Sequence, residues 1–158
     1  LSCLFFTAAV RVGYNPEIIW KEMSDMILNR GIPNGFLKEN PHGIEQLNTI
    51  PDAIQEMMLQ SYEGVIRIFP VWPRAKHPNA SFRNFRAWGG FEVSATLKDG
   101  EVERVTVLSH KGHPCRIKNP WPGKSVKVSY EYGRPDEVHF GKYINIEQYK
   151  EEHAELVI

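Results

Sequence analysis

The sequence predicts an α+β fold in which a helical first part is followed by an antiparallel β-sandwich. Three observations predict it. Apolar residues recur at helical spacing up to about residue 62, an alternation of apolar and polar residues begins near Gly64, and turn signals separate the short segments that follow. With 158 residues, the chain can hold two small domains, which we place at 1–62 and 63–158.

The first helix is expected at the start of the chain. Leu1, Leu4, Phe5, Ala8 and Val12 fall at helical spacing, and no capping residue precedes them. The apolar run is too short to span a bilayer and lacks the basic residues of a signal peptide. Because the chain also begins without Met, we expect it to be a fragment that starts inside a helix. The exposed helical face should then promote self-association.

A second helix is expected over "YNPEIIWKEMSDMILNRG". Asn15 is its predicted N-cap, Pro16 lies in its first turn and Gly31 is its predicted C-cap. The predicted apolar stripe consists of Ile19, Met23, Met26 and Ile27.

The segment "GIPNGFLKENPHG" is rich in Gly, Pro and Asn and is therefore a predicted loop. A third helix is expected over "TIPDAIQEMMLQS", where Thr49 and Asp52 have the spacing of a capping box. Its predicted buried residues are Ile50, Ala53, Ile54, Met57 and Met58.

The remaining chain predicts short strands. "GVIRIFP" is one, and the clearest element is "FEVSATLKDGEVERVTVLS", in which Asp99 and Gly100 predict a two-residue hairpin turn. Further strands are expected in "KSVKVSYEY", "EVHF", "YINI" and "HAELVI". Many short strands separated by turn signals are typical of an antiparallel sandwich.

Charge and cysteine content exclude several function classes. Lys plus Arg and Asp plus Glu both number 19, so the net charge is zero and neither nucleic acid nor an anionic membrane is an expected partner. Cys3 and Cys115 have no CxxC context and no histidine cluster, which argues against a zinc or redox site. We favour free, buried cysteines over a Cys3–Cys115 disulfide. No metal and no cofactor are expected.

Carboxylates near the third helix are the first candidates for catalysis. Glu45 lies just before the predicted helix, where free backbone N–H groups could keep its carboxylate ionised, as a general base requires. A capping or solvated carboxylate is the alternative that residue type alone favours. His42 is a weaker candidate, since a loop histidine is commonly a surface residue. Asp52 and Glu56 could share a proton or a metal, but an acid is favoured in a first helical turn anyway.

Three tryptophans are the candidates for substrate binding. Trp72, Trp88 and Trp121 lie in segments bounded by Pro or Gly, and exposed rings there could stack on sugars. We favour the alternative, in which these rings pack between the two domains, and Trp121 is the one for which sugar binding stays most open. We name Trp121, Trp88 and His42 as candidate substrate-binding residues. The sequence contains no nucleophile elbow, P-loop, Rossmann glycine set or HExxH motif.

One pair of segments resembles a known family. "IQEMMLQSYEGVIRIFPVWP" followed by "FRAWGGFEVSATLKDGEVERVTVLS" resembles the C-terminal part of glycoside hydrolase family 95, the inverting α-L-fucosidases and their relatives. In that family, a segment of the type "EMLLQSH-G-I-LLPALP" closes an (α/α)6 catalytic barrel, and "RARGGFEV" follows in a β-sandwich. The matching residues are Glu56, Met57, Leu59, Gln60, Ser61, Gly64, Ile66, Pro70, Arg86, Ala87, Gly89, Gly90 and Phe91. The resemblance covers residues 14–112.

The resemblance implies that 1–62 are the last helices of an (α/α)6 barrel and 63–158 its C-terminal β-sandwich. The family's general base is an Asp that lies eleven positions before the position of Glu56, which here is Glu45. The general acid and the asparagines that support the base would belong to an N-terminal barrel missing from this chain. The implied partner is a glycan bound by the full-length protein, and the parent would be secreted or periplasmic.

The chain also departs from the family. Where the family has "DGNFG" around its base, this sequence has "EQLNT". Glu is one methylene longer, and a shift of about 1 Å can cost on the order of a hundredfold in rate. The parent could therefore act on another sugar or have lost activity. Inverting hydrolysis needs two carboxyl groups, so we expect this fragment to be inactive alone. The alternatives are a non-catalytic carbohydrate-binding or structural β-sandwich module, and a partner-binding domain.

Overall fold

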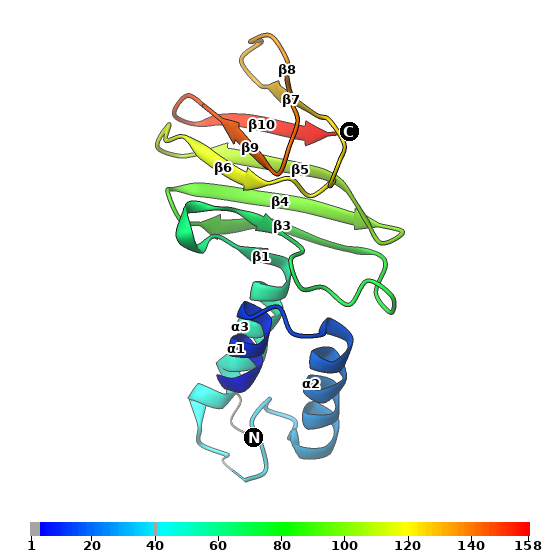
Figure 1. Ribbon diagram of the computed structural model, residues 1–158. Helices are drawn as coiled ribbons and strands as arrows, with labels where there is room; N and C mark the ends of the chain where they lie inside the picture. Colours follow the sequence, from blue (N-terminus) through cyan, green and yellow to red (C-terminus); the bar gives the residue numbers. More distant parts are fainter. Residues whose placement is uncertain (1–3, 40) are drawn as a thin grey trace. The chain divides into compact units, whose positions relative to one another are not determined.

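The computed structural model describes residues 4–39 and 41–158 and, among these, the side chains of all but Leu4 and residues 45–47. Helices form its first part and antiparallel strands the rest, so the predicted α+β class is confirmed (Figure 1). Two compact units result. Leu1–Met58 and Phe69–Lys76 form a helical unit, and Leu59–Ile68 and His77–Ile158 form a β unit.

The helical unit contains α1 (Leu4–Arg11), α2 (Pro16–Arg30) and α3 (Ile44–Met58). Asn15 caps α2 as predicted, because its Oδ1 accepts hydrogen bonds from the N–H groups of Glu17 and Ile18, at 2.9 and 3.3 Å. Gly31 follows α2 and donates its N–H to the Ile27 carbonyl. A Cβ at Gly31 would overlap that same oxygen, so the close approach requires glycine here.

The buried face of α2 consists of Ile19, Met23 and Met26, as the stripe predicts. The prediction is wrong for Ile27, whose side chain is 48% exposed, because it lies at the edge of the stripe. Trp72 is buried in the same unit, where its ring lies 5.4 Å from that of Trp20 and 5.9 Å from that of Phe69.

Helix α3 begins earlier than predicted and passes through Pro51. The predicted capping box is wrong, because Thr49 lies buried inside the helix and Asp52 accepts a hydrogen bond from Thr7 Oγ1 at 3.0 Å. Proline in a helix removes one backbone hydrogen bond, and the packing of α3 on α1 offsets that loss. The helix ends at Met58, before the predicted end, because the next two residues pair as a strand.

The β unit consists of antiparallel sheets. A six-stranded sheet has the order β3 (Ala80–Ala87), β4 (Phe91–Lys98), β5 (Glu101–Ser109), β10 (Glu152–Val157), β7 (Val126–Tyr130) and β8 (Glu137–His139). Two strand pairs accompany it: β6 (Cys115–Lys118) with β9 (Tyr143–Ile146), and β1 (Leu59–Gln60) with β2 (Arg67–Ile68). The β1–β2 loop contains a short 3₁₀ turn, Tyr62–Gly64.

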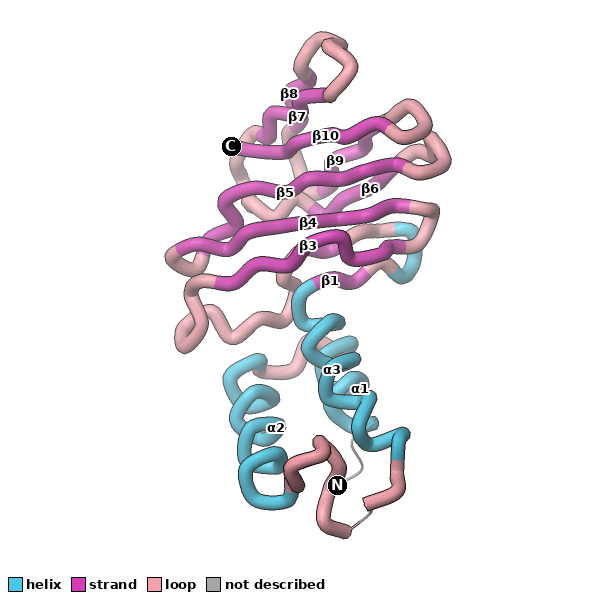
Figure 2. The backbone as a smooth tube through the Cα atoms, turned by 180° about the vertical axis from the view of Figure 1, so that it is seen from behind, coloured by secondary structure: helices cyan, strands magenta, loops and turns pink. Residues whose placement is uncertain are grey.

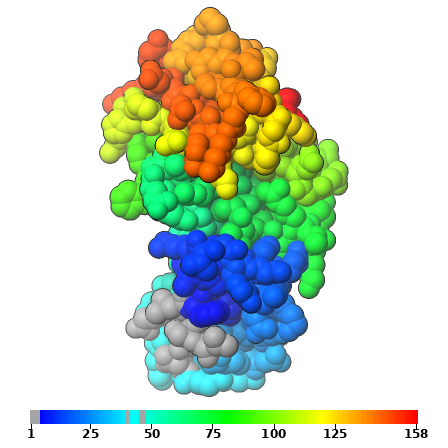
Figure 3. All heavy atoms as spheres, viewed as in Figure 1, coloured from blue at the N-terminus to red at the C-terminus, as the bar shows by residue number. Residues whose placement is uncertain are grey.

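The strand pairs form a second layer. Ile66 and Ile117 make a parallel bridge that joins the β2 end of one pair to β6 of the other. Figures 1 and 2 show β6 and β9 lying across one face of the six-stranded sheet, which gives a sandwich-like arrangement. On the surface in Figure 3, the segment around residues 60–66 lies beside these strands. No helix in the described part of the chain is long and apolar enough to span a membrane.

The hairpin between β4 and β5 is confirmed, whereas β3 and β6, like the two-residue strand β1, were not predicted. Asp99 and Gly100 both have positive φ, 51° and 79°, as a two-residue turn of this kind requires. Strand β3 does not show the alternation of apolar and polar residues, because a bulge between Phe82 and Phe85 interrupts it. Strand β6 has four residues and lies between Pro114 and Pro120, so its sequence looks like part of a loop.

Candidate functional site

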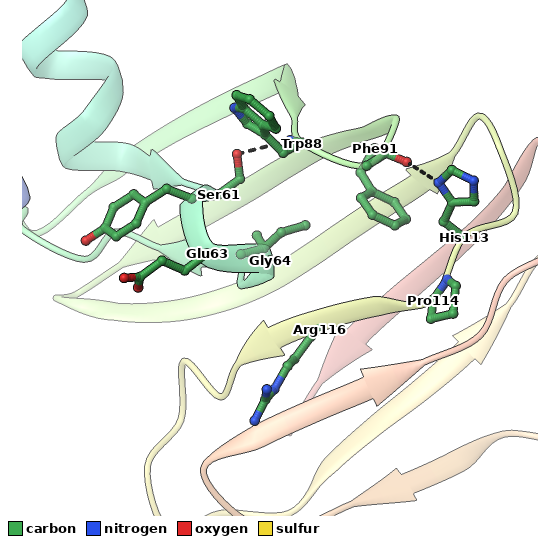
Figure 4. Close-up of a pocket in the computed structure, with 11 residues that line it drawn as sticks. Ser61, Glu63, Gly64, Trp88, Phe91, His113, Pro114 and Arg116 are labelled. Atoms are coloured by element: carbon green, nitrogen blue, oxygen red, sulfur yellow. Dashed lines mark hydrogen bonds between the residues drawn. The ribbon is translucent and has the colours of Figure 1, made fainter.

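A groove of about 420 Å³ opens in the β unit where segments distant in sequence meet (Figure 4). Its walls come from the β1–β2 loop, the β3–β4 turn, the β5–β6 loop and strand β6. The residues that matter for its chemistry are Glu63, Ile66, Trp88, Phe91, His113 and Arg116. Figure 4 shows that the labelled residues come from separate segments, and that the side chains of Glu63 and Arg116 extend outward from them.

The turn that carries Trp88 can be built only with glycine. Gly89 and Gly90 have φ of 93° and 81°, in the left-handed region. A Cβ at Gly89 would lie 2.6 Å from the ring of Phe91, and one at Gly90 would lie 2.9 Å from the side chain of Lys111. The two glycines therefore permit a tight turn directly above a buried ring.

Hydrogen bonds hold this turn from two sides. The Trp88 N–H donates to Ser61 Oγ of the β1–β2 loop at 3.1 Å. His113 Nδ1 lies 3.1 Å from the Gly89 carbonyl oxygen. Since a carbonyl only accepts, Nδ1 carries the proton in this contact, and Nε2 of the neutral ring is left as an acceptor. The indole of Trp88, 82% exposed, is thus presented on a fixed backbone.

The floor of the groove is apolar and its rim is charged. Phe91 and Ile66 are 4% and 3% exposed. At the rim, Glu63 pairs with Arg67 at 3.2 Å, and Arg67 also lies over the Tyr62 ring, 4.4 Å from its centroid.

Arg116 is the second cation at this site. Its guanidinium lies 4.1 Å from the centroid of the Tyr143 ring, which fixes its plane. Among the described residues it forms no salt bridge with a carboxylate. Its donors therefore stay available to a ligand, while the charge of Glu63 is already balanced by Arg67.

The predicted catalytic candidates lie in the helical unit. The backbone of Glu45 lies in the first turn of α3, not in the predicted loop before it, and its side chain is outside the described part. His42 is exposed in the turn before α3, and its carbonyl accepts a hydrogen bond from Ile44 N–H at 3.1 Å.

The other two carboxylates of α3 serve packing. Asp52 bonds Thr7, and Glu56 forms an ion pair with Arg11 at 2.7 Å, so both hold α1 against α3. In the described chain, no group of three or more His, Cys, Asp or Glu side chains could hold a metal ion. Cys115 is free and buried, and burial raises the pKa of its thiol to about 12. Cys3 lies outside the described residues.

The two tryptophans predicted to bind substrate have different environments. Trp121 is 3% exposed, and its indole N–H donates to the Val102 carbonyl at 2.5 Å, so no ring face is open to solvent. Trp88 is exposed and lines the groove. Sugar stacking is therefore supported by Trp88 alone.

The sequence of this unit also matches a known domain. Residues 60–153 match the model of the glycoside hydrolase family 95 C-terminal domain, which covers more than half of the chain. The chain belongs to glycoside hydrolase family 95. This confirms the resemblance, and it indicates glycans as the class of substrate. A comparison with curated proteins found no match.

All the groove residues lie inside the segment matched to family 95. Sequence reasoning identified Trp88 but missed Glu63, His113 and Arg116. Glycines gave the available signal, since Gly64, Gly89 and Gly90 all have positive φ and mark turns at the groove. The sequence did not indicate that these turns lie side by side, because strand β6 was not predicted.

The close contact between Gly89 and Phe91 at the groove leads to a prediction about stability. We expect Gly89→Ala to destabilise the chain by about 1–3 kcal/mol more than Gly100→Ala, because the new Cβ must displace the buried Phe91 ring. Gly100 is the matched control, since it has a similar φ of 79° but nothing within 4 Å of an added Cβ. Urea unfolding of both variants measures the difference, and equal stability would contradict the close packing.

Proposed function

We propose that this chain is the C-terminal part of an inverting, α-L-fucosidase-like glycoside hydrolase that acts on glycans. Residues 1–62 would be the last helices of its (α/α)6 barrel and 63–158 the β-sandwich that follows. The observation that supports this best is the family 95 match, which begins directly after helix α3. The eleven-residue spacing between Glu45 and Glu56 then makes Glu45 the candidate base.

In this proposal Glu45 activates the attacking water. The first turn of a helix is the positive end of the helix dipole, which favours an ionised carboxylate. Glu45 would take a proton from water as the oxygen bonds to the anomeric carbon. The glycosidic bond breaks on the opposite face, and an acid outside this chain protonates the leaving oxygen. His42, three residues before Glu45, is a candidate for binding substrate at the same helix end.

The isolated chain would have two properties. It would be inactive, because inverting hydrolysis needs a second carboxyl group about 6.5–9.5 Å from the first, with a water between them. It would also self-associate through its helical unit, where Phe5 of α1 and Val12, just after α1, are 55% and 79% exposed. The parent would be secreted or periplasmic, where extracellular glycans are accessible.

The test compares the parent enzyme with this chain on aryl α-L-fucosides and α-L-galactosides. We expect the parent to release the β-anomer first, seen by proton NMR before mutarotation, and this chain to release no sugar above the buffer rate. A first product of retained configuration would refute the inverting mechanism. Hydrolysis by the chain alone would refute the need for a second carboxyl group from the barrel.

A non-catalytic carbohydrate-binding role for the β unit is favoured by a separate observation, the groove at Trp88. It does not compete with hydrolysis by the parent, because a hydrolase can hold its substrate at a second site.

A further inference from the structure

We propose that the groove of the β unit is a sugar-binding site, in which one pyranose of a glycan stacks its C–H face on the indole of Trp88. The proposal uses the family membership of the chain, since this indicates glycans, and it does not depend on Glu45. It adds a binding site to the hydrolysis proposed above.

The first argument is the solvent exposure of the Trp88 ring. Trp72 and Trp121 are 7% and 3% exposed, whereas Trp88 is 82% exposed. Leaving so large an apolar ring in water forgoes the stabilisation that burial provides. The ring is also carried on a backbone fixed by Ser61 and His113. A preorganised aromatic platform loses little conformational entropy when a ligand covers it.

The second argument is the polar groups around the apolar floor. A sugar hydroxyl both donates and accepts hydrogen bonds. Arg116 supplies donors, while His113 Nε2 and the Glu63 carboxylate supply acceptors. The volume of about 420 Å³ lies within the range of small-molecule sites, about 300–1,000 Å³.

The same groups argue against a purely apolar occupant. A lipid chain or the apolar face of another polypeptide would cover Arg116 and His113 and leave their polar atoms without partners, which is costly. A hydroxylated ring satisfies them and covers Trp88 as well. A glycan is therefore the occupant that fits both the floor and the rim.

The experiment measures binding by the full 158-residue chain to an array of oligosaccharides, followed by titration with the best-bound glycan. Acrylamide quenching of tryptophan fluorescence reports on Trp88, because it is far more exposed than Trp20, Trp72 or Trp121. We expect the glycan to reduce quenching, and Trp88→Ala to weaken binding about tenfold or more. Phe140→Ala removes another exposed aromatic ring outside the groove, 73% exposed, and should bind as the wild type does.

A second variant tests the contribution of the polar rim independently of the Trp88 ring. Arg116→Met keeps an apolar stem but removes the guanidinium donors, so we expect weaker binding with unchanged quenching of the free protein. The proposal is overturned if the wild-type chain binds no glycan on the array, or if Trp88→Ala binds with wild-type affinity. Because binding and not hydrolysis is measured, that failure leaves the proposed function of Glu45 standing.

Discussion

If Glu45 is the general base of the proposed parent enzyme, replacing it by Gln should lower kcat by about 10²- to 10⁴-fold, the usual contribution of a general base. Gln has nearly the same shape but cannot take a proton from water. The effect should appear in kcat and in kcat/KM together, because the base acts in the transition state. Steady-state hydrolysis of an aryl α-L-fucoside measures it.

Two further variants show whether the carboxylate itself matters. Glu45→Asp keeps a carboxylate, the group the family resemblance places here, and should lose less activity than Glu45→Gln. Asp52→Asn is the matched control, since Asp52 lies on the same helix but accepts a hydrogen bond from Thr7, which Asn can also do. If Glu45→Gln retains the wild-type rate, Glu45 is not the base.

The pH profile gives an independent reading of the same residue. A general base works only when ionised, so kcat/KM of the wild-type parent should fall toward acidic pH. In the Glu45→Gln variant this acid-side fall should disappear, because Gln does not titrate. A merely structural role for Glu45 would leave the shape of the profile unchanged.

Replacing Trp121 by Ala should destabilise the chain by about 3–5 kcal/mol, the usual cost of removing a buried aromatic side chain. Trp121 is 3% exposed and donates its indole N–H to the buried Val102 carbonyl, so the change also leaves that oxygen without its partner. Since domains are stable by about 5–15 kcal/mol, this is a large share of the total. The urea midpoint should fall by on the order of 1–3 M.

Two controls separate packing from hydrogen bonding at Trp121. Trp121→Phe keeps most of the ring but loses the N–H donor, so its cost should be smaller than that of Ala. Trp88→Ala removes an indole of the same size that is 82% exposed, and its stability should change by no more than about 0.5 kcal/mol. The assignment of Trp121 to the core is wrong if Trp121→Ala unfolds at the wild-type midpoint.

These contrasts show which features can be derived from local sequence. The Asn15 cap and the Asp99-Gly100 turn were predicted correctly, because each depends on the residues within a few positions. The start of α3 was predicted incorrectly. Pro51 is a local signal for the start of a helix, but packing against α1 stabilises additional helical residues before Pro51.

The sequence alone is enough to predict a helical part followed by a β part, the α+β class and the motif spacing that indicates family 95. These follow from periodicity and from residue identity along one stretch of chain. Tertiary contacts place Trp121 in the core and Trp88 at a groove, which His113 and Arg116 also line. The two tryptophans occur in similar Gly- and Pro-bounded contexts, so the difference comes from strands that are distant in sequence and cover one ring but not the other.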